Sequence, residues 1–420
     1  MIPHYSIMSR SSNQIQNGRW IGWYGLAGIF LSALSLLAGP KPQPSLTQLK
    51  ARAKREVRLQ HNHRAVIALQ RAVTADPHWK LGWWDLADLL YQGKQYPAAA
   101  VAFRRLASLT PKVGLPWAML GLCEFEQRNF ENSLNHIQQG RALGLPNDAN
   151  LQAVVIYHEA QDMLVLEEFD QANFILHTFA VAHKPYPGAI LAFGLAALHL
   201  GLASEQAEKI LGPARLKLLQ AVGQAQYLAA EKKYALARQR YARIISHHPN
   251  LPYLHYAYGQ ILSNSGRITA AQSEYHKEIQ INPDGISARL QIATHEIAMG
   301  NLVRALFWAR QSLKLQPYNF AAQFMMGDIL FRQNHPRQAL PFILHSELLQ
   351  PNNSQIHYLL AQIYLHLHQM QAALREQKIF MRLHKIISRY MFTGVLPASV
   401  YLPSSRQPST RAKHKTRPSP

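Results

Sequence analysis

The chain has 420 residues, 48% of them hydrophobic and 16% charged, and this apolar content excludes an intrinsically disordered protein. Cys123 is the only cysteine, so an intrachain disulfide and a cysteine-ligated zinc or iron–sulfur site are also excluded. The net charge of +21 is concentrated at the ends, because residues 1–60 contribute +7 and residues 378–420 contribute +9. The body between them is only weakly basic, which argues against a general nucleic-acid binder.

Residues 20–39 form an uncharged, apolar run after a leader at residues 1–19. Twenty helical residues rise about 30 Å, the thickness of the hydrocarbon core of a bilayer. We therefore predict a single-pass transmembrane anchor or a signal segment, with a buried helix as a third interpretation, followed by a linker at residues 40–45. The basic residues after the run favour a cytoplasmic body, whereas cleavage would give a secreted or periplasmic protein. The side of the membrane stays open.

A 34-residue period governs the rest of the chain, beginning with Pro77 and Pro111 and returning at Pro249, Pro283, Pro317 and Pro351. Small residues keep the same phase at two sites of each unit. The first site holds Gly259, Ala293, Gly327 and Ala361, and the second holds Ala237, Ala271, Ala305, Ala339 and Ala373. Apolar residues at steps of three and four accompany them and predict amphipathic helices. Small residues on both helices of a pair allow a close antiparallel approach, so each period predicts one helical hairpin.

The pattern resembles the tetratricopeptide repeat family over roughly residues 46–390. This resemblance implies an all-α fold, a right-handed superhelical solenoid of about nine to ten helical hairpins. Residues 147–217 depart from the pattern, so we expect degenerate units there, with longer or skewed helices.

The resemblance also implies a site, because ligands of this family usually lie in a concave groove lined by the first helix of each hairpin. The matching residues are Trp84, Asp88, Tyr91, Phe125, Tyr253, Tyr256, Gln260, Phe324, Asp328, Phe331, Tyr358 and Gln362. Aromatic rings among scattered polar groups suit an extended peptide or an amphipathic helix. The alternative is that many of these side chains pack between hairpins. The Asn/Lys/Arg set with which some members clamp a C-terminal carboxylate is absent, so a chaperone-tail clamp is not expected.

Two charge features have competing interpretations. Acidic residues run from Asp148 to Asp170 without an intervening Lys or Arg, which predicts either a polarised groove or a solvated helix face. Among the 21 histidines, His366 and His368 follow His357 closely. The rings of a helical His-x-His pair point apart, so we expect packing or surface roles and no metal site.

No catalytic motif stands out. A phosphate loop, a dinucleotide fingerprint and a nucleophile elbow are absent from the sequence, and Cys123 falls at a position expected to be packed. We therefore predict a protein that is not an enzyme, with no cofactor and no small-molecule substrate.

The C-terminal end is basic. Residues 378–392 predict an amphipathic helix that either caps the array or contacts an anionic membrane, and residues 393–420 predict a disordered tail. Together these features predict a protein–protein interaction scaffold that is tethered to a membrane through residues 20–39 and binds a peptide or helix in its groove. Two alternatives are a non-catalytic subunit of an envelope assembly or polysaccharide-export machine, and polyanion or nucleic-acid binding through the basic ends, which is less favoured.

Overall fold

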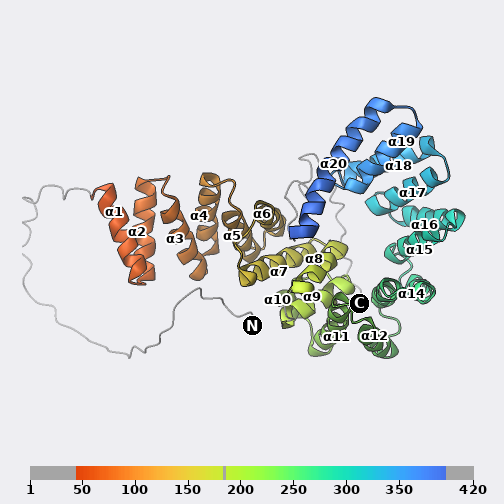
Figure 1. The fold of residues 1–420 in the computed structure, drawn as a ribbon. Coiled ribbons are helices and arrows are strands. Elements are labelled where there is room, and N and C mark those ends of the chain that lie inside the picture. The colour runs from red at the N-terminus through yellow and green to blue at the C-terminus, as the bar shows by residue number, and fades with distance from the viewer. Residues whose placement is uncertain (1–43, 183–185, 394–420) are drawn as a thin grey trace, which may run out of the picture. The chain divides into compact units, whose positions relative to one another are not determined.

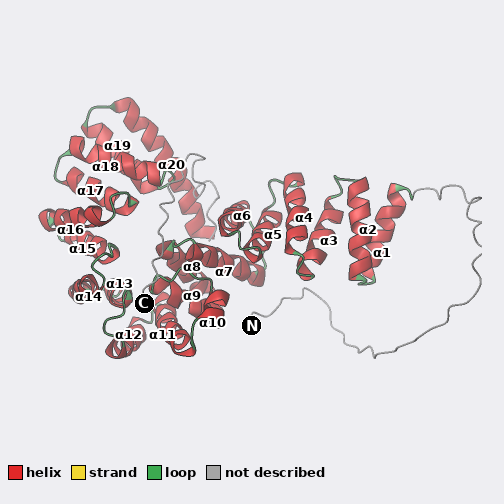
Figure 2. Ribbon diagram, turned by 180° about the vertical axis from the view of Figure 1, so that it is seen from behind, coloured by secondary structure: helices red, strands yellow, loops and turns green. Residues whose placement is uncertain are grey.

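The structure is a computed structural model that describes residues 44–182 and 186–393. These residues form twenty helices and no strand (Figure 2). The predicted leader and apolar segment, at residues 1–19 and 20–39, lie outside the described residues, as do most of the linker and all of the predicted tail at residues 393–420 except Thr393. Of the described helices, none is at once long enough and apolar enough to span a bilayer.

The chain divides into two compact units, Met1–Leu109 and Thr110–Pro420. In the first unit, α1 (Leu46–Arg58) pairs with α2 (Asn62–Ala75), and α3 (Lys80–Gln92) pairs with α4 (Tyr96–Leu109). Ser45 caps the start of α1 through a hydrogen bond from the Gln48 backbone N–H, which satisfies one of the free N–H groups at that end.

The second unit continues the same plan in its first and last hairpins, where each helix packs on its chain neighbour (Figure 1). Its first hairpins are α5 (Gly114–Glu126) with α6 (Phe130–Leu143) and α7 (Ala149–Val165) with α8 (Phe169–Ala182). Its last four are α13 (Leu254–Asn264) with α14 (Ile268–Ile281), α15 (Ser287–Ala298) with α16 (Leu302–Leu315), α17 (Phe320–Arg332) with α18 (Pro336–Leu349), and α19 (Ser354–His366) with α20 (Met370–Thr393). The predicted all-α fold of tandem hairpins is confirmed.

The small residues act as the period predicts. A Cβ added to Gly259 would collide with the Tyr275 ring, and one added to Gly327 would collide with the Ile343 side chain. Ala271 and Ala339, at the second small site, are completely buried. In the hairpins α13/α14 and α17/α18, a large side chain of the second helix therefore lies over a small residue of the first.

A second regularity links successive hairpins. After five of the prolines that lie between hairpins, the side chain six residues later carries an N–H group that faces the proline carbonyl, so this carbonyl has a hydrogen-bond partner. The pairs are Trp83 with Pro77 (3.1 Å), Gln152 with Pro146 (3.0 Å), His255 with Pro249 (2.9 Å), Gln323 with Pro317 (2.6 Å) and His357 with Pro351 (2.7 Å). Trp, Gln and His share only the N–H donor, which is why residue identity alone does not reveal the pattern.

The middle of the second unit departs from the plan between α8 and α13. It contains α9 (Pro187–Ala197), the short α10 (Ser204–Ile210), α11 (Pro213–Ala230) and α12 (Tyr234–His247). Here α9 packs mainly on α11 rather than on the helix that follows it. Gly194 and Gly223 permit this crossing, because a Cβ on either would overlap the backbone of the facing helix.

Candidate partner-binding surface

The last hairpins carry equivalent side chains on their first helices. On α17, Phe324, Asp328 and Phe331 are spaced by four and three residues and so share one face. On α19, Tyr358 occupies the position of Phe324 and Gln362 that of Asp328, each 34 residues later. The helices α17 and α19 are in contact. We call these five residues the first-helix surface. Its aromatic row runs beside a polar row of one carboxylate and one amide.

The first-helix surface is accessible and ordered. The Tyr358 side chain is 51% exposed, and the other four residues are half-buried. Neighbouring rings hold the aromatic row in place, since Tyr358 lies 5.3 Å from Phe380 between ring centroids and Phe331 contacts His366 edge-on. The Asp328 carboxylate pairs with the Arg332 Nε at 2.9 Å. A partner would meet preformed rings, which lowers the entropy lost on binding.

Tyr256 and Gln260 occupy the same repeat positions on α13, but there the environment differs. Tyr256 is only 3% exposed. Its hydroxyl accepts a hydrogen bond from the Gln260 amide at 2.7 Å and also bonds to the Asp170 carboxylate and the Gln291 amide. Burial, followed by the nearby Asp170, raises its pKa well above the usual value. A partner would reach Tyr256 only if the covering side chains moved, so its role as a partner contact stays a prediction.

A stack of three aromatic rings lies beside Tyr256. His199 lies between Phe169 and Tyr253, stacked on both at centroid distances of 4.6 and 4.0 Å. Phe169 begins α8, His199 follows α9 and Tyr253 precedes α13, so residues far apart in sequence meet here. Burial lowers the pKa of His199 to about 4, and its ring is therefore uncharged at neutral pH. The sequence analysis missed Phe169 and His199 because they belong to the degenerate units, where no period signals their position.

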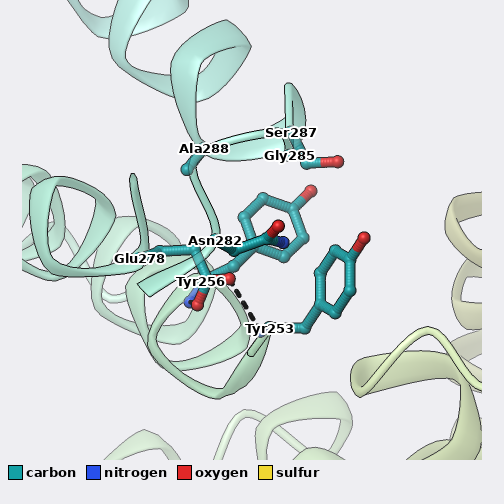
Figure 3. A pocket seen from close by; sticks show the side chains of 7 residues that line it. All are labelled: Tyr253, Tyr256, Glu278, Asn282, Gly285, Ser287 and Ala288. Carbon is teal, nitrogen blue, oxygen red and sulfur yellow. Dashed lines mark hydrogen bonds between the residues drawn. The ribbon is translucent and has the colours of Figure 1, made fainter. Parts of the chain in front are cut away.

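Tyr253 and Tyr256 line a small cleft with Glu278, Asn282, Gly285, Ser287 and Ala288 (Figure 3). The Glu278 carboxylate accepts hydrogen bonds from the backbone N–H groups of Tyr253 (2.7 Å) and Tyr256 (3.2 Å), and so caps the start of α13. The space between these side chains is about 170 Å³ even when open solvent is included, so the cleft is too small to enclose a small molecule. Its geometry supports a structural role for Glu278 rather than a cofactor site.

Of the other predicted groove residues, Trp84, Tyr91 and Phe125 contact rings of neighbouring helices, whereas Asp88 bonds within its own helix. Trp84 meets Phe103 edge-on at 5.9 Å, and Tyr91 meets Tyr96 at 5.6 Å. The Asp88 carboxylate accepts a hydrogen bond from the Gln92 amide at 2.8 Å, and burial raises the pKa of Asp88. These three are half-buried on α3 of the first unit. The ring contacts of Trp84 and Tyr91 are of the kind that the packing interpretation predicts, and a partner-binding role for these three residues stays a prediction.

Phe125, on α5, has the same character. Its ring lies 5.6 Å from Phe130 within the hairpin and 4.7 Å from His158 of α7. It therefore joins two successive hairpins. Cys123, two residues earlier on α5, is fully buried, and burial raises its thiol pKa to about 12, which confirms that it is a packed residue.

The two interpretations of the acidic residues between Asp148 and Asp170 are wrong for Glu159 and Asp162. Glu159 and Asp162 are 1% and 0% exposed, so at these residues the acidic stretch is neither a polarised groove nor a solvated face. Glu159 forms a buried ion pair with Arg141 of α6. Asp162 accepts a hydrogen bond from the Ser133 hydroxyl at 2.7 Å, and burial raises the Asp162 pKa well above its usual value. These two acidic side chains connect α6 to α7 inside the core. Counting acidic residues in the sequence does not show whether they are buried or exposed.

Two family models match parts of the chain. Residues 50–113 match the tetratricopeptide repeat, and residues 298–376 match anaphase-promoting complex, cyclosome, subunit 3. The fold is a tandem array of tetratricopeptide-like hairpins. The 34-residue period and the paired helices agree with both matched ranges.

Several solved structures resemble this tetratricopeptide-like array. The Cut9–Hcn1 hetero-tetramer of APC/C has 12% identity, covers 84% of this chain and 89% of its own, and has a TM-score of 0.37. The MamA RS-1 ArsTM double mutant has 16% identity, covers 40% and 95%, and has a TM-score of 0.36. Yeast Tom70 has 11% identity, covers 85% and 96%, and has a TM-score of 0.33. No curated protein sequence matches the chain.

Proposed function

We propose that this chain is a non-catalytic scaffold that binds a protein partner on its first-helix surface. The observation that carries the proposal is the repetition of an aromatic and a polar position, Phe324 with Asp328 and Tyr358 with Gln362, on adjacent first helices. Aromatic rings supply apolar contact area at low entropic cost, and the carboxylate and amide offer hydrogen bonds to a peptide backbone.

The spacing of the two helices suggests the form of the ligand. Packed helices lie about 8–10 Å apart, and three residues of an extended or polyproline II segment span about 9–10 Å. An extended ligand would therefore place one side chain on each hairpin at every third residue. A helical ligand would instead use residues seven apart, which span about 10 Å.

A cross-linked pull-down tests this function. The double variant Tyr358→Ala, Gln362→Ala removes both side chains from α19 without touching the buried Tyr256 region. Leu348→Ala is the matched control, because Leu348 lies on the second helix α18 and is 80% exposed. We expect the double variant to lose at least one partner that the control retains. Recovery of the same partners by both variants would contradict the proposal.

We further propose that residues 20–39 tether the scaffold to a membrane. An uncharged apolar run with aromatic residues at one end supports this, as argued from the sequence. The full chain should remain in the membrane fraction after alkaline carbonate extraction, and a variant lacking residues 1–43 should not. Reporters fused after residue 60 and after residue 420 would determine the side. Membrane retention of the shortened chain would contradict the tether.

A further inference from the structure

Three metal-ligating side chains converge at the C-terminal hairpins. Glu347 extends from α18, His357 from α19 and Glu376 from α20, and one donor atom of each lies within 4.8 Å of the other two. His357 Nδ1 is 2.7 Å from Glu376 Oε2 and 3.9 Å from Glu347 Oε1. The His357 side chain is 2% exposed, whereas the two carboxylates are 14% and 29% exposed. The cluster is therefore anchored in the core and open on its carboxylate side.

The His357 ring is oriented as a ligand would be. Its Nε2 lies 2.7 Å from the Pro351 carbonyl, and a carbonyl oxygen only accepts, so Nε2 carries a hydrogen. Nδ1 then faces the two carboxylates. Histidines that bind metals commonly donate the other ring N–H to a carbonyl or carboxylate, which fixes the tautomer and the direction of the free lone pair.

We propose that Glu347, His357 and Glu376 form a binding site for a divalent transition-metal cation, best suited to Zn²⁺. Zinc bonds of about 2.0–2.2 Å to nitrogen and oxygen place tetrahedral ligand atoms about 3.3 Å apart. The two distances from Nδ1, 2.7 and 3.9 Å, bracket that value, so small rotations of the carboxylates complete the geometry. Two carboxylates balance the charge of the ion, any proton on Nδ1 passes to solvent, and a water or a partner's side chain takes the fourth position.

The chain contains an internal control for this assignment. His255 holds the same repeat position 102 residues earlier, with Nε2 facing the Pro249 carbonyl and Nδ1 2.5 Å from Glu274. The position equivalent to Glu347 is Ile245, and Lys277 pairs with Glu274 at 2.8 Å. The earlier site thus has one carboxylate and a neighbouring cation, as a structural ion pair requires.

The later site has a second carboxylate without such compensation. The Glu347 and Glu376 carboxylates both face His357 Nδ1, so their negative charges lie close together. A bound divalent cation would relieve this repulsion. In the sequence His357 stands close to His366 and His368, whereas the two carboxylates that face it lie on α18 and α20, and no spacing along one helix predicts that contact.

Calorimetric titration of the full chain with Zn²⁺ tests the proposal, with Mg²⁺ as the comparison ion, because imidazole ligands favour zinc over magnesium. Two variants copy residues that the chain itself uses at these repeat positions. Glu347→Ile copies Ile245, and His357→Gln copies Gln323, whose amide also donates to the proline carbonyl. His255→Gln is the matched control. We expect each of the first two variants to weaken the tightest zinc site by about 100-fold or more, and the control to change it by less than about twofold.

A second readout keeps the test independent of folding defects. Zn²⁺ should raise the melting temperature of the natural chain and of His255→Gln, but not that of Glu347→Ile. The proposal is overturned if the natural chain binds no Zn²⁺ at micromolar concentration, if Mg²⁺ binds there equally well, or if His255→Gln loses as much affinity as His357→Gln.

Discussion

Replacing Gly140 by alanine sets two known effects against each other. Alanine is favoured over glycine in a helix interior by about 0.8–1.0 kcal/mol, so an isolated α6 would gain stability. In the structure, however, a Cβ at residue 140 would lie 2.6 Å from the Ala118 backbone nitrogen and 2.8 Å from the Gly114 carbonyl oxygen. Both atoms belong to the backbone of α5, so no side-chain rotation relieves the overlap.

The overlap should outweigh the gain in helix propensity. Overpacking a core costs about 1–3 kcal/mol, and a collision with backbone belongs in the upper part of that range. The expected net loss is about 1–2 kcal/mol, or roughly 2–8 °C in melting temperature. Thermal unfolding followed by far-ultraviolet circular dichroism measures it. Gly212→Ala is the control, because Gly212 has a φ of −67° and no atom would lie within 4 Å of an added Cβ. A higher melting temperature for Gly140→Ala would refute the close approach of α5 and α6.

Three further predictions concern charge. Burial raises the pKa of Asp162, so the contribution of this carboxyl group to stability is present at low pH and is lost as pH rises through the raised pKa. The variant Asp162→Asn should therefore have a higher melting temperature than the natural chain at pH 8. A lower melting temperature at that pH would contradict this prediction. The hydrogen bond with Glu274 is the largest cause that raises the pKa of His255. The natural chain should therefore exceed His255→Gln in stability most strongly near pH 6, and this difference should become smaller as pH rises above the raised pKa. A stability difference that grows with pH would be inconsistent with the ion pair. Removal of residues 394–420 deletes five basic side chains and should abolish most salt-dependent binding to DNA of unrelated sequence, whereas unchanged binding would exclude the tail as its cause.

The hairpins were predictable because each repeats the same local physics. Proline spacing marked the turns, and small residues such as Gly259 and Gly327 marked the points where helices approach closely. The first-helix positions followed from the same phase, since a 34-residue period places equivalent residues on equivalent faces. The crossing of α9 and α11 was not predictable, because it depends on Gly194 and Gly223, which are out of phase with the repeat.

Exposure was harder to predict than position. Tyr256 and Tyr358 are equivalent by period, yet one is 3% and the other 51% exposed. The difference arises because His199 and Asp170, from the degenerate units, pack against Tyr256. Likewise the Arg141–Glu159 pair is buried between helices, and no spacing rule within one helix reveals a contact of that kind.

The central claim is that the first-helix surface is where a partner binds, and site-specific photo-cross-linking tests it most directly. A photoreactive phenylalanine analogue would be placed at residues 324 and 358 on first helices. The controls would be residues 303 and 348 on second helices, where Val303 and Leu348 are 78% and 80% exposed. We predict that residues 324 and 358 cross-link to the same partner and that the two controls do not. Equal cross-linking from the controls, or none from residue 358, would contradict the account.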